Sequence, residues 1–186
     1  GKRKLYSVPN IFAVEGGPDD YRSLVELYWE EVLLHVDKLE AAGKITKIFC
    51  EGILSSDKEA LEGLADVNPG APGLLKRKMS EGAELFPLES QELFGPFIDW
   101  ANCLYVVRSE EVAAKVLDFY NVAAAKRLSH IQEIIEGNMC EAEAGLLIMG
   151  PDERSKIQFA RDIEVFLVTP PLYDDLLKWV RDNLNR

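Results

Sequence analysis

The stretch "GLLIMGPDERSKIQFARDIEVFLVTPP" (145–171) contains two short apolar runs that indicate the fold of the chain. The runs at 146–149 and 163–168 are rich in branched residues, and glycine or proline residues bound them. Near-continuous apolar runs of this length are typical of parallel strands that are buried on both faces of a sheet. Between them, the charged turn "GPDER" (150–154) begins where the first strand would end. The stretch therefore predicts two buried strands, with charged groups placed at the end of the first.

The rest of the chain alternates between strand patterns and helical patterns. Further strands are expected at 5–12, 45–52 and 83–89, and Pro9 suggests that the first is an edge strand or is bent. Helices are expected at 18–42, around 57–64, at 74–82, from 109 towards 137 and from 171 to 184, and the pattern at 91–108 allows another. Because this alternation favours parallel pairing, we predict a single α/β domain over 1–186, with a mainly parallel sheet and helices on both faces in three layers.

The long helix after Ser109 is expected to cover the core along most of its length. Ser109 is a suitable N-cap, and apolar residues recur behind it at helical spacing. The core face of this helix is expected to hold Val112, Val116, Phe119, Tyr120, Ala123, Ile131 and Ile134.

Charge and cysteine content limit the classes of function. With 21 basic and 32 acidic residues the net charge is −11, which disfavours binding to nucleic acid or to an anionic membrane surface. No apolar run approaches the roughly 18 residues of a membrane helix. The three cysteines are far apart and form no CxxC pair, so we expect reduced thiols in a cytoplasmic protein.

Acidic residues follow four of the five predicted strands. In open parallel sheets ligands bind at the carboxyl ends of the strands, so these acids are candidate ligand-binding groups. Carboxylates about 6 Å apart would repel each other by roughly 3 kcal/mol, and a cluster would need a cation, a shared proton or an arginine. The alternative is that these are ordinary solvated loop acids. The candidate residues are Glu15, Glu51, Glu89, Asp152 and Glu153, with Arg154 as the nearest balancing charge.

Five stretches in order along the chain resemble a family of uncharacterised bacterial proteins that is distantly similar to the TraB/Tiki and erythromycin-esterase-like group. They are "LYSVPNIFAVEGGPDD", "IFCEGIL", "EGAELFPLES", "AAAKRLSHIQEIIEG" and "GLLIMGPDERSKIQFARDIEV". The resemblance implies the same α/β fold. The better-known relatives are implicated in metal-dependent proteolysis, haem handling or hydrolysis of a macrolide ester.

The chain departs from this family at two positions where the family has histidine. Phe12 stands in place of the first histidine and Glu153 in place of the second, whereas Glu51 replaces an aspartate and Glu89 matches an acid. The departures imply either a member that has lost catalysis or one that uses carboxylates alone, so enzymatic activity stays open.

Three hypotheses follow from the sequence. The first is a small-ligand-binding or regulatory protein with an acidic pocket at the strand ends. The second is a hydrolase that depends on magnesium or manganese, in which Glu51 and Glu153 hold the metal and a neighbouring acid activates water. The third is a non-catalytic homodimer that pairs through the wide apolar face at 21–39 and the C-terminal helix that carries Trp179.

Overall fold

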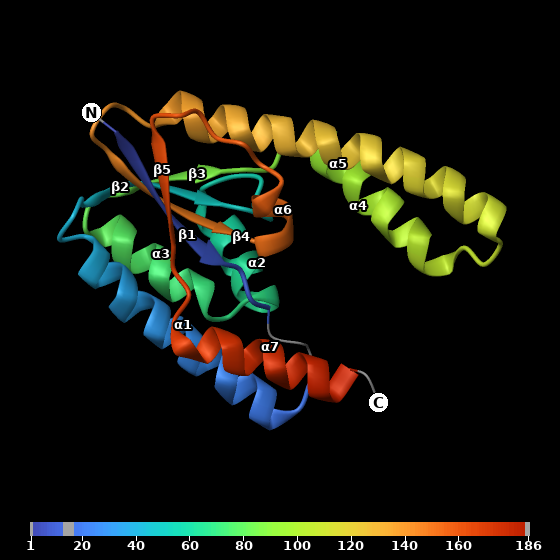
Figure 1. Cartoon of the computed structure of the whole chain (residues 1–186), viewed down its shortest axis with the longest axis horizontal. Coiled ribbons are helices and arrows are strands. Elements are labelled where there is room, and N and C mark those ends of the chain that lie inside the picture. Colours follow the sequence, from blue (N-terminus) through green and yellow to red (C-terminus); the bar gives the residue numbers. More distant parts are fainter. Residues whose placement is uncertain (1, 13–16, 185–186) are drawn as a thin grey trace.

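A computed structural model describes residues 2–12 and 17–184, and its centre is a sheet with the strand order β3-β2-β4-β1-β5 (Figure 1). All four neighbouring pairs of strands are parallel. The predicted α/β fold with a parallel sheet is therefore confirmed. The strands are β1 (Arg3–Pro9), β2 (Ile45–Cys50), β3 (Glu84–Pro87), β4 (Ala144–Met149) and β5 (Ile163–Leu167).

Helices cover both faces of the sheet, and each face has its own apolar core. Neighbouring residues of β4 point to opposite sides, so Leu146 joins the first core and Leu147 the second. The first core packs against α1, α2, α3 and α7, and the second packs against α5 and the segment after α6. The helices are α1 (Asp19–Leu39), α2 (Lys58–Val67), α3 (Ala71–Ser80), α4 (Gln91–Val106), α5 (Glu110–Asn138), α6 (Pro151–Ser155) and α7 (Pro171–Leu184). The predicted turn at 150–154 is thus mostly the short helix α6.

The first strand lies inside the sheet, so the prediction of an edge strand from Pro9 is wrong. β1 pairs with β4 on one side and β5 on the other. The ladder with β5 ends at Ser7, so Pro9 lies beyond it, where no backbone N–H is needed. Pairing with β4 continues through Pro9 to Asn10, whose N–H donates to the Met149 carbonyl over 3.0 Å.

The wide apolar face of α1 is covered by elements of the same chain. Tyr21 packs against Trp179 of α7 with ring centroids 4.7 Å apart, and the indole N–H of Trp179 donates to Asp20 over 2.8 Å. Tyr28 and Val32 are buried against the sheet. The homodimer expected through these two helices remains a prediction, although their apolar faces are largely used within the chain.

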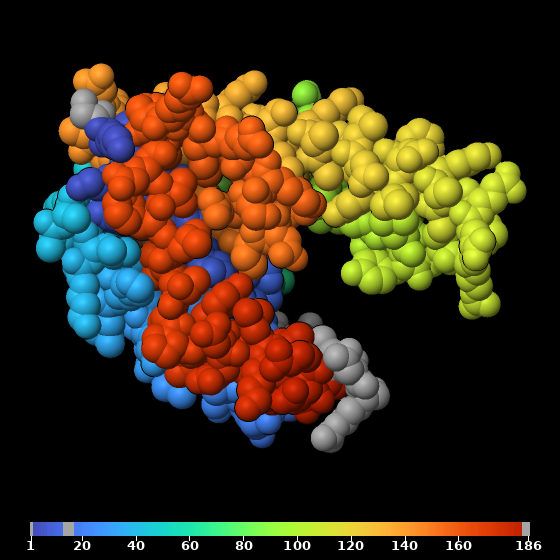
Figure 2. Space-filling view, in the orientation of Figure 1, coloured from blue at the N-terminus to red at the C-terminus, as the bar shows by residue number. Residues whose placement is uncertain are grey.

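Helices α4 and α5 form a hairpin that projects from the body of the molecule (Figures 1 and 2). Ser90 and Ser109 cap the two helices by accepting hydrogen bonds from backbone N–H groups. A helix of 29 residues is about 43 Å long, about twice the length of a six-residue strand, so only the second half of α5 lies on the sheet. The predicted core face is therefore wrong at Val112 and Phe119, which are 45% and 54% exposed.

Two further expectations concern membranes and thiols. In the part of the chain that the structure describes, no helix is both long enough and apolar enough to cross a bilayer. Cys50, Cys103 and Cys140 are free thiols, and they are buried, half-buried and exposed respectively.

Candidate functional site at the carboxyl edge of the sheet

The end of β4 is the topological switch point of the sheet. The chain leaves β1 and β2 towards helices on the first face, whereas it leaves β4 towards α6 and the second core. The segments that follow these strands therefore leave the sheet towards opposite faces, and open α/β sheets bind ligands at such switch points. Asn10, Glu51 and Gly150 directly follow β1, β2 and β4 and meet at this point.

Glu51 is held at the switch point by three hydrogen bonds. Its Oε1 accepts from the Asn10 side-chain amide over 3.0 Å and from the Gly150 backbone N–H over 2.8 Å. Its Oε2 accepts a longer bond of 3.4 Å from Arg127. The Glu51 side chain is 11% exposed, so its carboxylate is largely but not completely removed from water.

Glu89 and Arg127 form a two-point ion pair beside Glu51. Arg127 Nε donates to Glu89 Oε1 over 2.8 Å, and Nη2 donates to Oε2 over 2.7 Å. The backbone N–H of Gly52 also donates to Glu89 Oε2 over 2.8 Å. The Glu89 side chain is completely buried and that of Arg127 is 5% exposed. Arg127 thus provides the positive charge that two neighbouring carboxylates require.

Two aromatic rings of α4 cover the guanidinium of Arg127. Its carbon lies 4.7 Å from the ring centroid of Phe97 and 5.8 Å from that of Phe94. Rings at this distance attract the cation and keep water from it. The contact also links the ionic cluster to the helical hairpin.

A buried amide chain extends the cluster to the other face of the sheet. Asn68, which ends α2, donates to Asn10 Oδ1 over 2.7 Å, and Asn10 in turn donates to Glu51. Asn68 and Asn10 are both buried. A continuous series of hydrogen bonds therefore runs from Asn68 through Asn10, Glu51 and Arg127 to Glu89.

Burial dominates the electrostatics of the site. Burial raises the pKa of Glu51 above its ordinary value of 4.5, although the bonds from Asn10 and Gly150 and the charge of Arg127 oppose that rise. Burial acts against the charged form of Arg127, but the hydrogen bonds and charges of Glu89 and Glu51 together outweigh it, so the pKa of Arg127 is raised. Burial also raises the pKa of the Cys50 thiol, so this cysteine is an inert core residue at neutral pH.

The structure places the predicted site residues in different surroundings. Glu51 and Glu89 come together through Arg127, and not through Arg154. Asp152 is exposed on α6. Glu15 lies outside the described residues.

Glu153 of α6 has one carboxylate oxygen without a partner. Its Oε1 pairs with Lys156 over 3.0 Å, whereas its Oε2 is buried and accepts no hydrogen bond. A buried acceptor without a donor is rare in native structures and marks a position where a donor from water or a ligand is expected.

The part of the chain that the structure describes adds no further ligand to Glu51 and Glu153, the two residues that are predicted to hold a metal ion. Among the described residues, no group of three or more histidine, cysteine, aspartate or glutamate side chains is placed to hold a metal ion. Arg127 already sets a positive charge against Glu51. Binding of magnesium or manganese by Glu51 and Glu153 stays a prediction.

Sequence reasoning missed Arg127, Asn10 and Asn68. Arg127 carries a signal in retrospect, because it lies four residues from both Ala123 and Ile131 on the buried face of α5. A charged residue in the apolar stripe of a helix is expected to have a buried partner of opposite charge. Asn10 and Asn68 lie in loops and have no comparable signal in the sequence.

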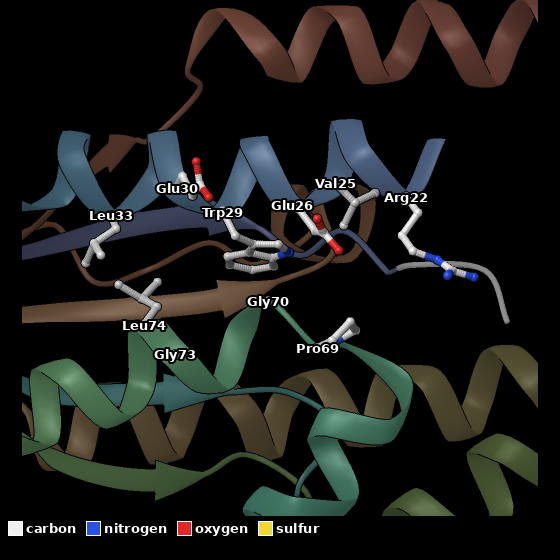
Figure 3. A pocket seen from close by; sticks show the side chains of 10 residues that line it. All are labelled: Arg22, Val25, Glu26, Trp29, Glu30, Leu33, Pro69, Gly70, Gly73 and Leu74. Atoms are coloured by element: carbon white, nitrogen blue, oxygen red, sulfur yellow. The ribbon is translucent and has the colours of Figure 1, made fainter. Parts of the chain in front are cut away.

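A groove of about 360 Å³ between α1 and the start of α3 lies beside this edge (Figure 3). Trp29 lines it, and its indole N–H donates to the Ile11 carbonyl over 3.3 Å. A Cβ atom at Gly70 would lie 2.1 Å from Trp29 Cδ1, so only glycine allows this close approach. Pro69 and Gly70 line the groove directly after Asn68, and the groove therefore adjoins the buried amide chain.

No family model matches the sequence, and no curated protein matches it either. Among solved structures, the chain is similar to RRSP, a MARTX toxin effector domain from Vibrio vulnificus CMCP6, with a TM-score of 0.40 and 15% sequence identity. The match covers 80% of this chain, which spans 27% of the length of that structure.

Proposed function

We propose that this protein binds a small organic molecule that carries hydrogen-bond donors, at the carboxyl edge of its sheet. The observation that carries the proposal is that two carboxylates in the segments that follow β2 and β4 retain acceptor capacity. Glu51 Oε2 accepts only a 3.4 Å bond from Arg127, and the buried Glu153 Oε2 accepts none. Each of these oxygens therefore has capacity to accept a hydrogen bond from an N–H group of a ligand.

The charge of the cluster favours a cation over an anion. Glu51 and Glu89 contribute −2 and Arg127 contributes +1, so the cluster carries −1 (−2 + 1) in a largely buried position. A ligand cation adds a favourable charge interaction there, whereas an anion would be repelled in a medium of low effective dielectric. An amidine, amine or guanidine group is the ligand chemistry that fits.

Arg127 contacts both Glu51 and the helical hairpin, so a ligand at Glu51 would also affect the hairpin, which supports a regulatory role. A ligand donor at Glu51 Oε2 competes with Arg127 for that oxygen, and Arg127 lies against Phe97 of α4. Binding is therefore expected to change the packing of Arg127 on α4.

We further propose that the protein acts in the bacterial cytoplasm. The free thiols of Cys50, Cys103 and Cys140 support a reducing compartment, and the resemblance to a bacterial family supports the source. The metal-dependent hydrolase gains no specific support from the geometry.

The test uses three probes of equal size and different charge: benzamidine, benzamide and benzoate. At ten times its dissociation constant a ligand adds about 1.4 kcal/mol, which is roughly 3–6 °C in Tm for a chain of this length. We expect a shift with benzamidine, a smaller one with benzamide and none with benzoate. The shift should disappear in the double variant Glu51→Gln/Glu153→Gln and persist in Glu164→Gln, an exposed acid of β5. A response that persists in the double variant, or that is equal for benzoate, would contradict the proposal.

A further inference from the structure

The α4–α5 hairpin is rich in exposed apolar side chains for its length. Of the fourteen large apolar side chains that are exposed among the described residues, seven lie on this hairpin. Only two of the sixteen residues of α4, Glu92 and Asp99, are charged, yet α4 contains no buried residue. A helix of this composition is normally covered.

A groove of about 440 Å³ runs along one side of the hairpin, between the two helices. Trp100 of α4 and Phe119 of α5 stack with centroids 4.8 Å apart and line it together with Pro96 and Val122. Phe119 and Val122 are 54% and 55% exposed. In the space-filling view the hairpin stands away from the body over much of its length, which leaves it accessible (Figure 2).

We propose that this groove packs against the same groove of a second copy, so that the two hairpins form a four-helix bundle. Paired hairpins with apolar inner faces are a standard helical arrangement. The sixteen residues of α4 span about 24 Å, and two helices side by side present a face about 20 Å wide. This projected area of about 500 Å², increased by the corrugation of side chains, approaches the roughly 800 Å² per partner of a stable interface.

The charges of the hairpin favour a second copy in an antiparallel, two-fold arrangement. The chain carries −11, but the charged residues that line the groove are Glu92 and Lys126, which cancel. On α5, Glu111 and Lys126 lie fifteen residues apart (126 − 111), about 22 Å, with Phe119 midway between them. A two-fold axis near Phe119 therefore sets Glu111 of each copy against Lys126 of the other, and places the two Phe119 rings at the centre.

The first experiment measures molar mass by light scattering over a concentration series. We expect twice the monomer mass of 20.9 kDa for the wild type, and 20.9 kDa for Phe119→Asp and Val122→Asp. Leu34→Asp, which changes a 62% exposed residue of α1, should remain dimeric. Far-UV circular dichroism shows that each variant keeps its helices. A monomeric wild type would overturn the proposal, as would a dimer that persists in both groove variants or that Leu34→Asp also dissociates.

The second experiment tests the antiparallel geometry by charge reversal. Glu111→Lys and Lys126→Glu should each raise the dimer dissociation constant about fivefold or more, because each places like charges opposite each other twice per dimer. The double variant should return it to near the wild-type value. A double variant that dissociates more readily than either single variant would exclude this arrangement.

Discussion

Replacement of Arg127 by methionine tests whether the ion pair with Glu89 holds α5 on the sheet. Methionine has similar length and fills the space beneath Phe97, but it leaves the completely buried Glu89 carboxylate with only the Gly52 N–H. Removing one member of a buried pair costs about 3–5 kcal/mol, because the remaining charge has lost its compensation. For a chain of this length we expect Tm to fall by roughly 6–20 °C.

A double-mutant cycle separates this interaction from the loss of packing. Glu89→Gln keeps an acceptor for the N–H groups of Gly52 and Arg127 but removes the charge, and alone it leaves Glu51, at 3.4 Å, as the only carboxylate that pairs with Arg127. The double variant Arg127→Met/Glu89→Gln removes both charges, so neither is left buried without its partner. We therefore expect its destabilisation to be about 2 kcal/mol or more below the sum of the single effects.

The assay is urea denaturation followed by circular dichroism, with the free energy of unfolding extrapolated to water. Arg127→Lys is the matched control, because it keeps the charge and loses the two-point geometry, and an intermediate loss is expected. The reasoning would be refuted by an Arg127→Met variant within about 1 kcal/mol of the wild type. It would equally be refuted by strictly additive single effects.

Three more predictions follow from the same contacts. The pKa of Glu51 is raised on folding, so its contribution to stability falls as pH rises from about 4.5 through the folded-state pKa. The free energy of unfolding of Glu51→Gln minus that of the wild type should increase over this window in urea titrations, and a constant difference would contradict the assignment. Gly70→Ala, at the N-cap of α3, should lower stability by about 1–3 kcal/mol because its Cβ meets Trp29, whereas Gly73→Ala, inside α3 with open space around its Cβ, should be neutral or slightly stabilising. Equal effects in thermal melts would argue against the close approach. Millimolar magnesium or manganese should raise Tm no more in the wild type than in Glu51→Gln, because among the described residues Glu51 belongs to no group of three or more side chains placed to hold a metal ion; a metal shift that only the wild type shows would support the hydrolase hypothesis.

The sheet was predictable because most of its strands coincide with short apolar runs in the sequence. The apolar run at 146–149 corresponds to β4, which is buried along its whole length and therefore has apolar residues at successive positions. The run at 163–168 corresponds to β5, but this strand lies at the edge of the sheet and only its Ile163 is buried, so the prediction of a second buried strand is wrong. The interior position of β1 was not predictable. Pro9 lacks a backbone N–H, but this prevents pairing only if the neighbouring strand, here β5, extends as far as Pro9. The sequence does not show that the pairing with β5 ends at Ser7.

The candidate site was only partly predictable. The rule that ligands bind at strand ends selected Glu51 and Glu89, but their partner Arg127 is on a helix 76 and 38 residues away in sequence. Helical periodicity alone also assigned Phe119 to the core. Periodicity identifies the apolar face of a helix, but it does not show where the sheet beneath that face ends.

The measurement that tests the ligand site most directly is a ¹⁵N–¹H NMR titration of the protein with benzamidine. The backbone N–H groups of Gly52 and Gly150 each donate to a site carboxylate over 2.8 Å, so they report on any new donor there. We predict saturable shifts centred on these two amides, absent from the Glu51→Gln/Glu153→Gln variant and absent with benzoate. Shifts confined to the α1–α3 groove, or unchanged in the double variant, would contradict a ligand site at the carboxyl edge of the sheet.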